Sequence, residues 1–239
     1  MTKLSVNINK IALIRNSRGA NYPDLVQIAK DCEKFGADGI TIHPRPDERH
    51  ARYADVPVLK AIVKTELNVE GNPIPKFLKM VMENQPHQCT LVPDAPDALT
   101  SDAGWDTIKH KGFLTDTIAK LRAAGIRTSI FINPDERMIE GAKAVGTDRI
   151  EFYTGPYAHN YSEGKRKAVA DYARCGKLAH QLGLGINAGH DLNTTNLNYF
   201  IKNVGNVAEV SIGHALISDA LYYGLHHTIL MYLKECRNV

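Results

Sequence analysis

The chain has 239 residues, of which 44% are hydrophobic and 23% are charged, as in an ordinary globular protein. Its net charge of +3 is too small and too dispersed to indicate a nucleic-acid-binding surface, although it suits small anionic ligands. No stretch approaches the roughly 20 apolar residues of a membrane span, and polar residues interrupt positions 1–15 before a signal-peptide core could form. The cysteines are widely separated, which predicts free, packed thiols at Cys32, Cys89, Cys175 and Cys236. We therefore expect a soluble cytoplasmic protein that neither binds nucleic acid nor enters a membrane.

Short apolar runs rich in Val, Ile and Thr alternate along the chain with longer segments of helical periodicity. The short runs predict strands at 4–8, 39–43, 67–70, 88–92, 128–132, 149–154, 185–188 and 209–212. The longer segments predict helices at 24–36, 74–84, 113–124, 136–145, 164–182, 194–203 and about 218–235. Eight strands, each followed by a helix, within about 240 residues predict an α/β protein with the (β/α)₈ TIM-barrel fold. We expect residues 1–239 to form one such domain.

An open, doubly wound sheet is the alternative architecture. It usually has fewer strands and often a glycine-rich turn after the first strand, whereas residues 6–19 contain no GxGxxG motif. Five predicted helices are followed by a glycine that fits a C-terminal cap, namely Gly36, Gly125, Gly146, Gly183 and Gly205. The segment 41–58 is too rich in proline and charge for regular structure and is predicted to be a functional loop.

Polar residues occur at the C-terminal ends of most predicted strands, where the active site of a TIM barrel lies. The residues at these ends and just beyond them are Asn7, Asn9, His43, Glu70, Thr100, Glu151, Asn187, His190, Gly213 and His214. A single histidine at a strand end is more often a packed or solvated group. Several ionisable groups that converge on one rim from separate strands predict an active site.

Three of the strand–helix loops predict binding sites for phosphate. Arg45 lies in the motif HPRP, where proline restricts the backbone, and its guanidinium could hold a phosphate by two parallel hydrogen bonds. His50 belongs to the same loop, whereas Arg49 and Arg52 fit a solvated surface equally well. Small residues precede the helices after strands seven and eight, where Gly213 would expose its backbone N–H to an anion.

No motif in the chain indicates a cofactor, because the P-loop, the nicotinamide fingerprint and the GxSxG motif are absent. The predicted strands also lack a central lysine that would suggest a Schiff-base aldolase. Histidine and glutamate could ligate a metal, but the first strand carries NIN where metal-dependent hydrolase barrels commonly have HxH. We therefore favour acid–base roles for His43, Glu70 and His190, and expect neither metal nor cofactor.

Eight blocks of sequence resemble the pyridoxine 5′-phosphate synthase family and follow the family order along essentially the whole chain. The blocks are VNINKIALIRNSRG (6–19), GADGITIHPRPDERH (36–50), LNVE (67–70), LVP (91–93), AGIRTSIFI (124–132), IEFYTGPYA (150–158), INAGHDL (186–192) and SIGHALI (211–217). The resemblance implies a (β/α)₈ barrel with a few additional helices, assembled as a homo-octamer built from dimers. It also implies that 3-amino-2-oxopropyl phosphate condenses with 1-deoxy-D-xylulose 5-phosphate, giving pyridoxine 5′-phosphate, phosphate and water without a metal or an organic cofactor.

The same resemblance implies a role for individual residues. The general bases of the family correspond to His43 and Glu70, its general acid to His190, and its transition-state-stabilising carboxylate to Glu151. Its contacts to the aminoketone phosphate correspond to Asn7, Arg18, Asp191, Gly213 and His214. Its contacts to the pentulose phosphate correspond to Arg45, His50 and Thr100.

Two positions depart from the common pattern of the family. Many members have Asp-His where this chain has Asn9-Lys10, and many have glycine where it has Asp191. Both changes concern binding positions and leave the catalytic positions unaltered. Two other functions stay open: a phosphosugar isomerase, epimerase or aldolase, which would lack the loop of Arg45 and His50, and an inactive barrel that binds phosphometabolites, against which the intact acid–base set argues.

Overall fold

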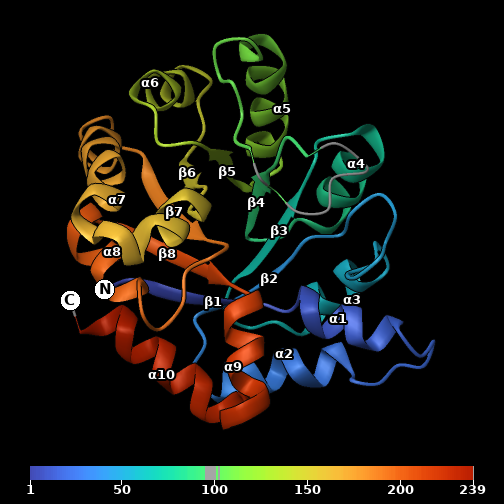
Figure 1. The fold of residues 1–239 in the computed structure, drawn as a ribbon. Helices are drawn as coiled ribbons and strands as arrows, with labels where there is room; N and C mark the ends of the chain where they lie inside the picture. Colours follow the sequence, from blue (N-terminus) through green and yellow to red (C-terminus); the bar gives the residue numbers. More distant parts are fainter. Residues whose placement is uncertain (95–100, 102, 239) are drawn as a thin grey trace.

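The computed structural model describes residues 1–94, 101 and 103–238. Its eight strands are all parallel, and each pairs with its neighbours in chain order until β8 pairs with β1, which closes the barrel (Figure 1). The strands are β1 (Lys3–Asn7), β2 (Gly39–Ile42), β3 (Leu67–Gly71), β4 (Gln88–Leu91), β5 (Arg127–Ile132), β6 (Arg149–Phe152), β7 (Gly185–Gly189) and β8 (Val207–Ile212). This closed topology confirms the predicted (β/α)₈ barrel and excludes the open, doubly wound sheet.

The helices form a layer around the barrel (Figure 1). They are α1 (Asn9–Asn16), α2 (Leu25–Lys34), α3 (Asp55–Ile62), α4 (Pro75–Asn84), α5 (Lys111–Ala123), α6 (Glu136–Ala144), α7 (Gly155–Gln181), α8 (Leu197–Val204), α9 (His214–Tyr223) and α10 (Leu225–Arg237). The glycines at positions 36, 125, 146, 183 and 205 all have positive φ angles, between 70° and 102°. Glycine adopts this backbone conformation without a steric penalty, so the predicted helix caps are confirmed.

The helices differ from the prediction in four places, of which two, α1 and α3, were not predicted as helices. Helix α1 begins at Asn9, directly after the first strand, and α3 begins at Asp55 inside the segment predicted to be a loop. The helix expected over 218–235 consists of α9 and α10, because Gly224 at φ 73° turns the chain between them. Helix α7 includes the predicted 164–182 segment but starts nine residues earlier and is interrupted at Gly164.

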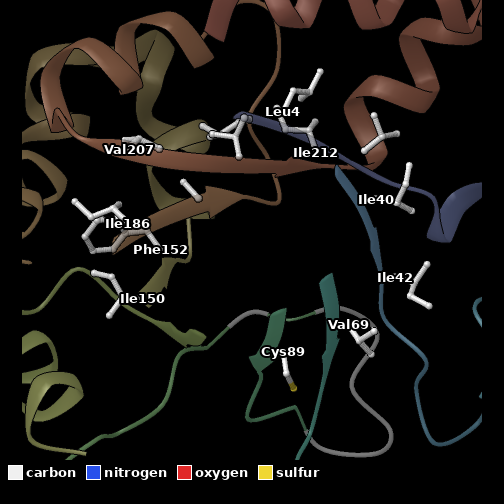
Figure 2. Close-up of a cluster of buried hydrophobic side chains, with 14 of the residues drawn as sticks. Leu4, Ile40, Ile42, Val69, Cys89, Ile150, Phe152, Ile186, Val207 and Ile212 are labelled. Atoms are coloured by element: carbon white, nitrogen blue, oxygen red, sulfur yellow. The ribbon is translucent and has the colours of Figure 1, made fainter. Parts of the chain in front are cut away.

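The barrel strands alternate apolar residues toward the helices with polar residues toward the barrel axis. Figure 2 shows part of the outer set, including Leu4, Ile40, Val69, Phe152 and Ile212, which belong to one buried hydrophobic cluster with residues of the helices. The inner set is linked by hydrogen bonds between neighbouring strands. The Ser5 and Thr41 hydroxyls bond to each other, Asn68 donates to Thr41, and Thr90 donates to Asn68. Polar side chains therefore reach deep into the barrel below the site.

Charged side chains close the N-terminal end of the barrel. Arg127 hydrogen-bonds to Glu66, and Arg149 Nη1 lies 3.0 Å from both Glu209 Oε2 and Asn187 Oδ1. Asn187 is thus engaged in this network and does not line the cavity at the opposite end, so its prediction as a rim residue was wrong. We expect this network to stabilise the barrel, since the active site of a TIM barrel lies at the opposite, C-terminal face.

The four cysteines are free and buried, as the sequence predicts. Among the helices that the structure describes, none is both long enough and apolar enough to cross a lipid bilayer.

Candidate active site

A cavity of about 550 Å³ opens at the C-terminal ends of the strands. It collects residues from the ends of β1, β2, β3, β6, β7 and β8, as expected for parallel strands that converge in a closed barrel. Of the twelve predicted site residues, ten line this cavity: Asn7, His43, Arg45, His50, Glu70, Glu151, His190, Asp191, Gly213 and His214. A second cavity of about 620 Å³ adjoins it and shares His190, Asp191 and His214.

The remaining two predicted residues are Arg18 and Thr100. Arg18 is exposed, lies beyond the end of α1 and is not among the residues that line either cavity. Thr100 lies outside the described residues. Their proposed contacts to phosphate therefore stay predictions from the family resemblance.

Helix α1 fixes the loop that carries Arg45 and His50. The buried Arg15 binds Asp55 at the start of α3 through two hydrogen bonds of 2.7 and 2.9 Å. The neighbouring Asn16 Nδ2 donates to the carbonyl oxygen of His50 at 2.8 Å. A bidentate arginine–carboxylate pair is a geometrically specific contact, so α1 anchors the second half of the loop, from His50 to the start of α3.

Arg45 enters the cavity already paired with a carboxylate. Its Nη2 lies 2.6 Å from Asp94 Oδ2, and the Ser101 hydroxyl donates to the same oxygen at 2.6 Å. Sequence reasoning missed Asp94 and Ser101, because they lie in an irregular segment after β4 without periodicity or a motif. Asp94 orients the guanidinium group of Arg45 and compensates its charge at the wall of the cavity.

His43 and His50 are both neutral imidazoles at neutral pH. Burial, followed by the positive charge of Arg45, lowers the pKa of His43 well below 6.5 and lowers the pKa of His50 to about 4. His50 Nδ1 accepts a hydrogen bond from the backbone N–H of Ala51 at 2.9 Å, which leaves its ring proton on Nε2. His43 can therefore accept a proton, and His50 can donate a hydrogen bond to a phosphate.

Glu70 and Glu151 are buried carboxyl groups of the same cavity. Burial, together with the negative charge of Glu151, raises the pKa of Glu70 well above 4.5. Burial also raises the pKa of Glu151 to about 7, although His190 and Thr90 favour its ionised form. Glu70 Oε2 lies 3.8 Å from His43 Nδ1. Carboxyl groups with raised pKa values beside a neutral imidazole can exchange protons near neutral pH, as general acid–base catalysis requires.

His190 follows β7 and lies where the two cavities meet. Its Nδ1 is 2.7 Å from Asp191 Oδ2, and the edge of the Tyr153 ring packs against it with ring centroids 5.8 Å apart. After the adjacent strand β8, Gly213 precedes the first turn of α9, and an added Cβ at Gly213 would come within 3.1 Å of Asn7. Among the described residues, no cluster of three or more His, Cys, Asp or Glu side chains is arranged to hold a metal ion.

Glu151→Gln is expected to stabilise the fold at alkaline pH. Oε2 of Glu151 is buried and has no hydrogen-bond partner among the described residues, so ionisation in the folded state is unfavourable. The folded pKa of about 7 exceeds the ordinary 4.5, so the protonated carboxyl contributes stability below about pH 4.5 that is lost as the pH rises through 7. Glutamine is uncharged throughout, which predicts a gain on the order of 1–3 kcal/mol above pH 7.

Urea unfolding of both proteins at pH 8 and at pH 4.5 measures this difference. The gain should be present at pH 8 and nearly absent at pH 4.5. The exposed Glu140→Gln on α6 provides the control and should show no such pH-dependent gain. A Glu151→Gln variant that is less stable than the wild type at pH 8 would show that ionisation of Glu151 does not destabilise the folded state.

Comparison with known proteins agrees with this geometry. The family model described as "Pyridoxal phosphate biosynthesis protein PdxJ" matches residues 4–238. A relative from Christiangramia forsetii, named pyridoxine 5′-phosphate synthase, is 59% identical over 234 residues, which cover 98% of this chain and 99% of the relative. Relatives with the same name are 59% identical in Cytophaga hutchinsonii (99% and 100% covered) and 56% identical in Bacteroides fragilis (99% of both).

Solved structures of other enzymes share the fold. Phosphoribosyl anthranilate isomerase from Thermotoga maritima aligns over the whole of both chains with a TM-score of 0.61 and 14% identity. Thiamine phosphate pyrophosphorylase from Pyrococcus furiosus aligns over 99% of this chain and 96% of its own, with a TM-score of 0.64 and 10% identity. Such low identities show a common barrel and nothing about activity. The full-length match to the family model and the relatives at 56–59% identity show that this chain belongs to the PdxJ family of pyridoxal phosphate biosynthesis proteins.

Proposed function

We propose that this chain is a pyridoxine 5′-phosphate synthase, which condenses 3-amino-2-oxopropyl phosphate with 1-deoxy-D-xylulose 5-phosphate. The observation that carries the proposal is the convergence of His43, Glu70, Glu151 and His190 in one cavity together with the cationic Arg45. The membership of the family supports the choice of substrates.

The chemistry of ring closure matches the groups in the cavity. Forming a pyridine ring from an aminoketone and a ketose requires an imine, the loss of water and phosphate, and the closure of a carbon–carbon bond. Each of these steps moves protons. His43 as a neutral imidazole and Glu70 as a carboxyl with a raised pKa supply bases, His190 supplies the acid, and Glu151 stabilises positive charge that develops on the substrate.

Two phosphorylated substrates require two anion sites. Arg45 and His50 form one candidate site at the loop after β2, where the pentulose phosphate would bind. Gly213 and the N-terminal turn of α9 form the other, beside Asn7 and His214, where the aminoketone phosphate would bind. Both sets of residues line the same cavity as the acid–base groups, an arrangement that would hold both substrates close to those groups.

An assay with the purified protein tests the proposal and separates it from the alternatives. Incubation with both substrates should produce the absorbance of pyridoxine 5′-phosphate without added metal. Incubation with either substrate alone should leave that substrate unchanged, whereas an isomerase, epimerase or aldolase would convert the pentulose phosphate alone. No product with both substrates, or conversion of one alone, would contradict the proposed function.

Lys10→Ala is expected to raise KM for 1-deoxy-D-xylulose 5-phosphate by about 2- to 5-fold, with kcat little changed. Lys10 lines the cavity near the loop of Arg45, and its charge contributes to the lowered pKa of His50, after burial and the nearby arginines. Asn9 Oδ1 accepts the backbone N–H of His43 at 2.9 Å, so its amide nitrogen stays available for a sugar hydroxyl.

The salt dependence of KM distinguishes a charge contact from a change in shape. The loss in Lys10→Ala should shrink at high salt, because ions screen an exposed charge on this length scale. Lys120→Ala on the outer surface of α5 is the control for the lost charge. A rise in KM confined to the aminoketone phosphate would show that Lys10 does not contact the pentulose phosphate.

We propose further that the chain assembles as a homo-octamer built from dimers and acts in the cytoplasm. Large exposed apolar side chains on α1 and α9 support self-association, namely Leu13, Ile14, Leu221, Tyr222 and Tyr223. Free, buried cysteines fit a reducing compartment. Light scattering on the purified protein should give a mass eight times the 26.4 kDa of one chain.

A further inference from the structure

We propose that Asp191 is a positioning residue, whose carboxylate accepts the Nδ1 proton of His190 and leaves Nε2 as the atom that exchanges protons with substrate. This proposal rests on the proposed function for the role of His190 in turnover. It gives Asp191 a different role from the phosphate contact that the family resemblance implies for this position. The general bases on the other side of the cavity are unaffected.

The contact between the two side chains determines which ring nitrogen carries the proton. Asp191 Oδ2 lies 2.7 Å from His190 Nδ1, the distance of a strong, charge-assisted hydrogen bond. An ionised carboxylate only accepts hydrogen bonds, so Nδ1 must be the donor. The hydrogen bond from His190 is also the largest cause that lowers the pKa of Asp191, which keeps this carboxylate ionised. Nε2 of the neutral ring is then unprotonated, and it gains a proton when the ring is charged.

The backbone after β7 is arranged so that these two consecutive side chains meet. His190 has a φ angle of 47°, in the left-handed region that non-glycine residues rarely adopt. The turn is secured by Leu192 N–H bound to the Gly189 carbonyl at 3.1 Å, and by Asn196 Nδ2 bound to the Asp191 carbonyl at 3.4 Å. A conformation of this kind is unfavourable and persists where the surroundings enforce it, frequently at active sites.

The ring of His190 is therefore held from two directions. Asp191 fixes one edge, and Tyr153 from the segment after β6 packs against the ring at an interplanar angle of 79°. Among the described residues, other titratable groups that interact with His190 or Asp191 include Glu151 on β6, His43 after β2, His214 on α9 and Tyr172 on α7. A fixed imidazole with a defined tautomer delivers its proton to one place in the cavity, which is the requirement for a general acid.

A carboxylate is poorly suited to contact phosphate directly. Two negative groups within a few ångströms repel each other, and the Asp191 side chain is already engaged by His190. His214, which lines both cavities, also favours the ionised form of Asp191. A phosphate contact at this position would therefore come from the backbone.

A double-mutant cycle tests whether Asp191 acts through His190. Asp191→Ala should lower kcat about 10-fold and change KM for either substrate less than about 2-fold. Asp191→Asn keeps an acceptor for Nδ1 but removes the negative charge, so it should retain more of kcat than Asp191→Ala does. In the His190→Asn background, Asp191→Ala should cause no further loss. Asp116→Asn, exposed on α5, is the control for removal of one negative charge.

A second measurement does not depend on turnover. The ¹⁵N shifts of the His190 ring, assigned by their absence in His190→Asn, should report the Nδ1–H tautomer in the wild type and a shift toward Nε2–H in Asp191→Ala. An Nε2–H tautomer in the wild type, or an undiminished effect of Asp191→Ala in the His190→Asn background, would overturn the proposal. If the wild type forms no pyridoxine 5′-phosphate but shows the Nδ1–H tautomer, the proposed function fails and the positioning of His190 by Asp191 stands.

Discussion

Glu70→Gln is expected to lower kcat by roughly 10²-fold or more while the barrel stays folded. Glutamine has the shape of glutamate but can neither take up nor release the proton that ring closure requires. The carboxyl of Glu70 has a pKa raised by burial and by the charge of Glu151, and it lies beside the neutral His43. Asn68 Nδ2 donates to Oε1 at 3.3 Å, a hydrogen bond that the side-chain oxygen of glutamine can also accept. The substitution therefore removes proton transfer with little change in packing.

Steady-state kinetics and urea unfolding of Glu70→Gln should be compared with those of Glu209→Gln. Glu209 is also buried inside the barrel, and burial raises its pKa to about 8, but it pairs with Arg149 at the opposite end. Glu209→Gln should leave kcat within about 2-fold of the wild type. Near wild-type kcat in Glu70→Gln would make Glu70 a structural residue. An equal loss in Glu209→Gln would show that any glutamine inside the barrel disturbs catalysis.

The eight strands could be predicted from sequence because a parallel sheet covered by helices imposes a simple pattern. Each strand is a short run of β-branched and apolar residues, and glycine marks the end of most preceding helices. The helix after β1 was missed because NKIALIRN follows the strand without a turn signal or a side-chain cap. The start of α3 was missed because Pro57 suggests irregular structure, yet proline is tolerated in the first turn of a helix.

The candidate site could be predicted to a similar extent for a related reason. Residues at the ends of parallel strands must meet at one rim, so His43, Glu70, Glu151 and Gly213 required only correct strand boundaries. Residues in irregular segments are not placed by the end of a strand, so their contacts cannot be predicted in this way. Asp94 is 49 positions from Arg45, and only the folded chain shows that they form a buried ion pair.

Asn187 shows the limit of the strand-end argument. It lies two residues before the end of β7, close enough to the rim in sequence to be predicted there. Its side chain instead belongs to a deeper layer of the barrel, where it accepts a hydrogen bond from Arg149. Because every second side chain of a strand points into the barrel, a shift of two positions along the strand decides between a rim residue and one in a deeper layer.

His190→Asn is expected to lower kcat by roughly 10²-fold or more with little change in KM. Asparagine can still hydrogen-bond to Asp191 and tolerates the left-handed backbone at this position better than most residues, so the turn after β7 should persist. It cannot transfer a proton near neutral pH, so the alkaline limb that a general acid imposes on kcat should disappear from the pH profile.

His180→Asn provides the matched control, since this histidine is exposed near the end of α7 and lines neither cavity. It should leave both kcat and the pH profile unchanged. A His190→Asn variant with near wild-type kcat would show that the imidazole is a structural group and would remove the general acid from the mechanism. A loss of kcat with the alkaline limb intact would show that another group causes that limb. Glu151 is the first residue to test for this role, because its pKa is raised to about 7. The pH profile therefore separates the two acids of the cavity, which a fall in rate alone cannot do.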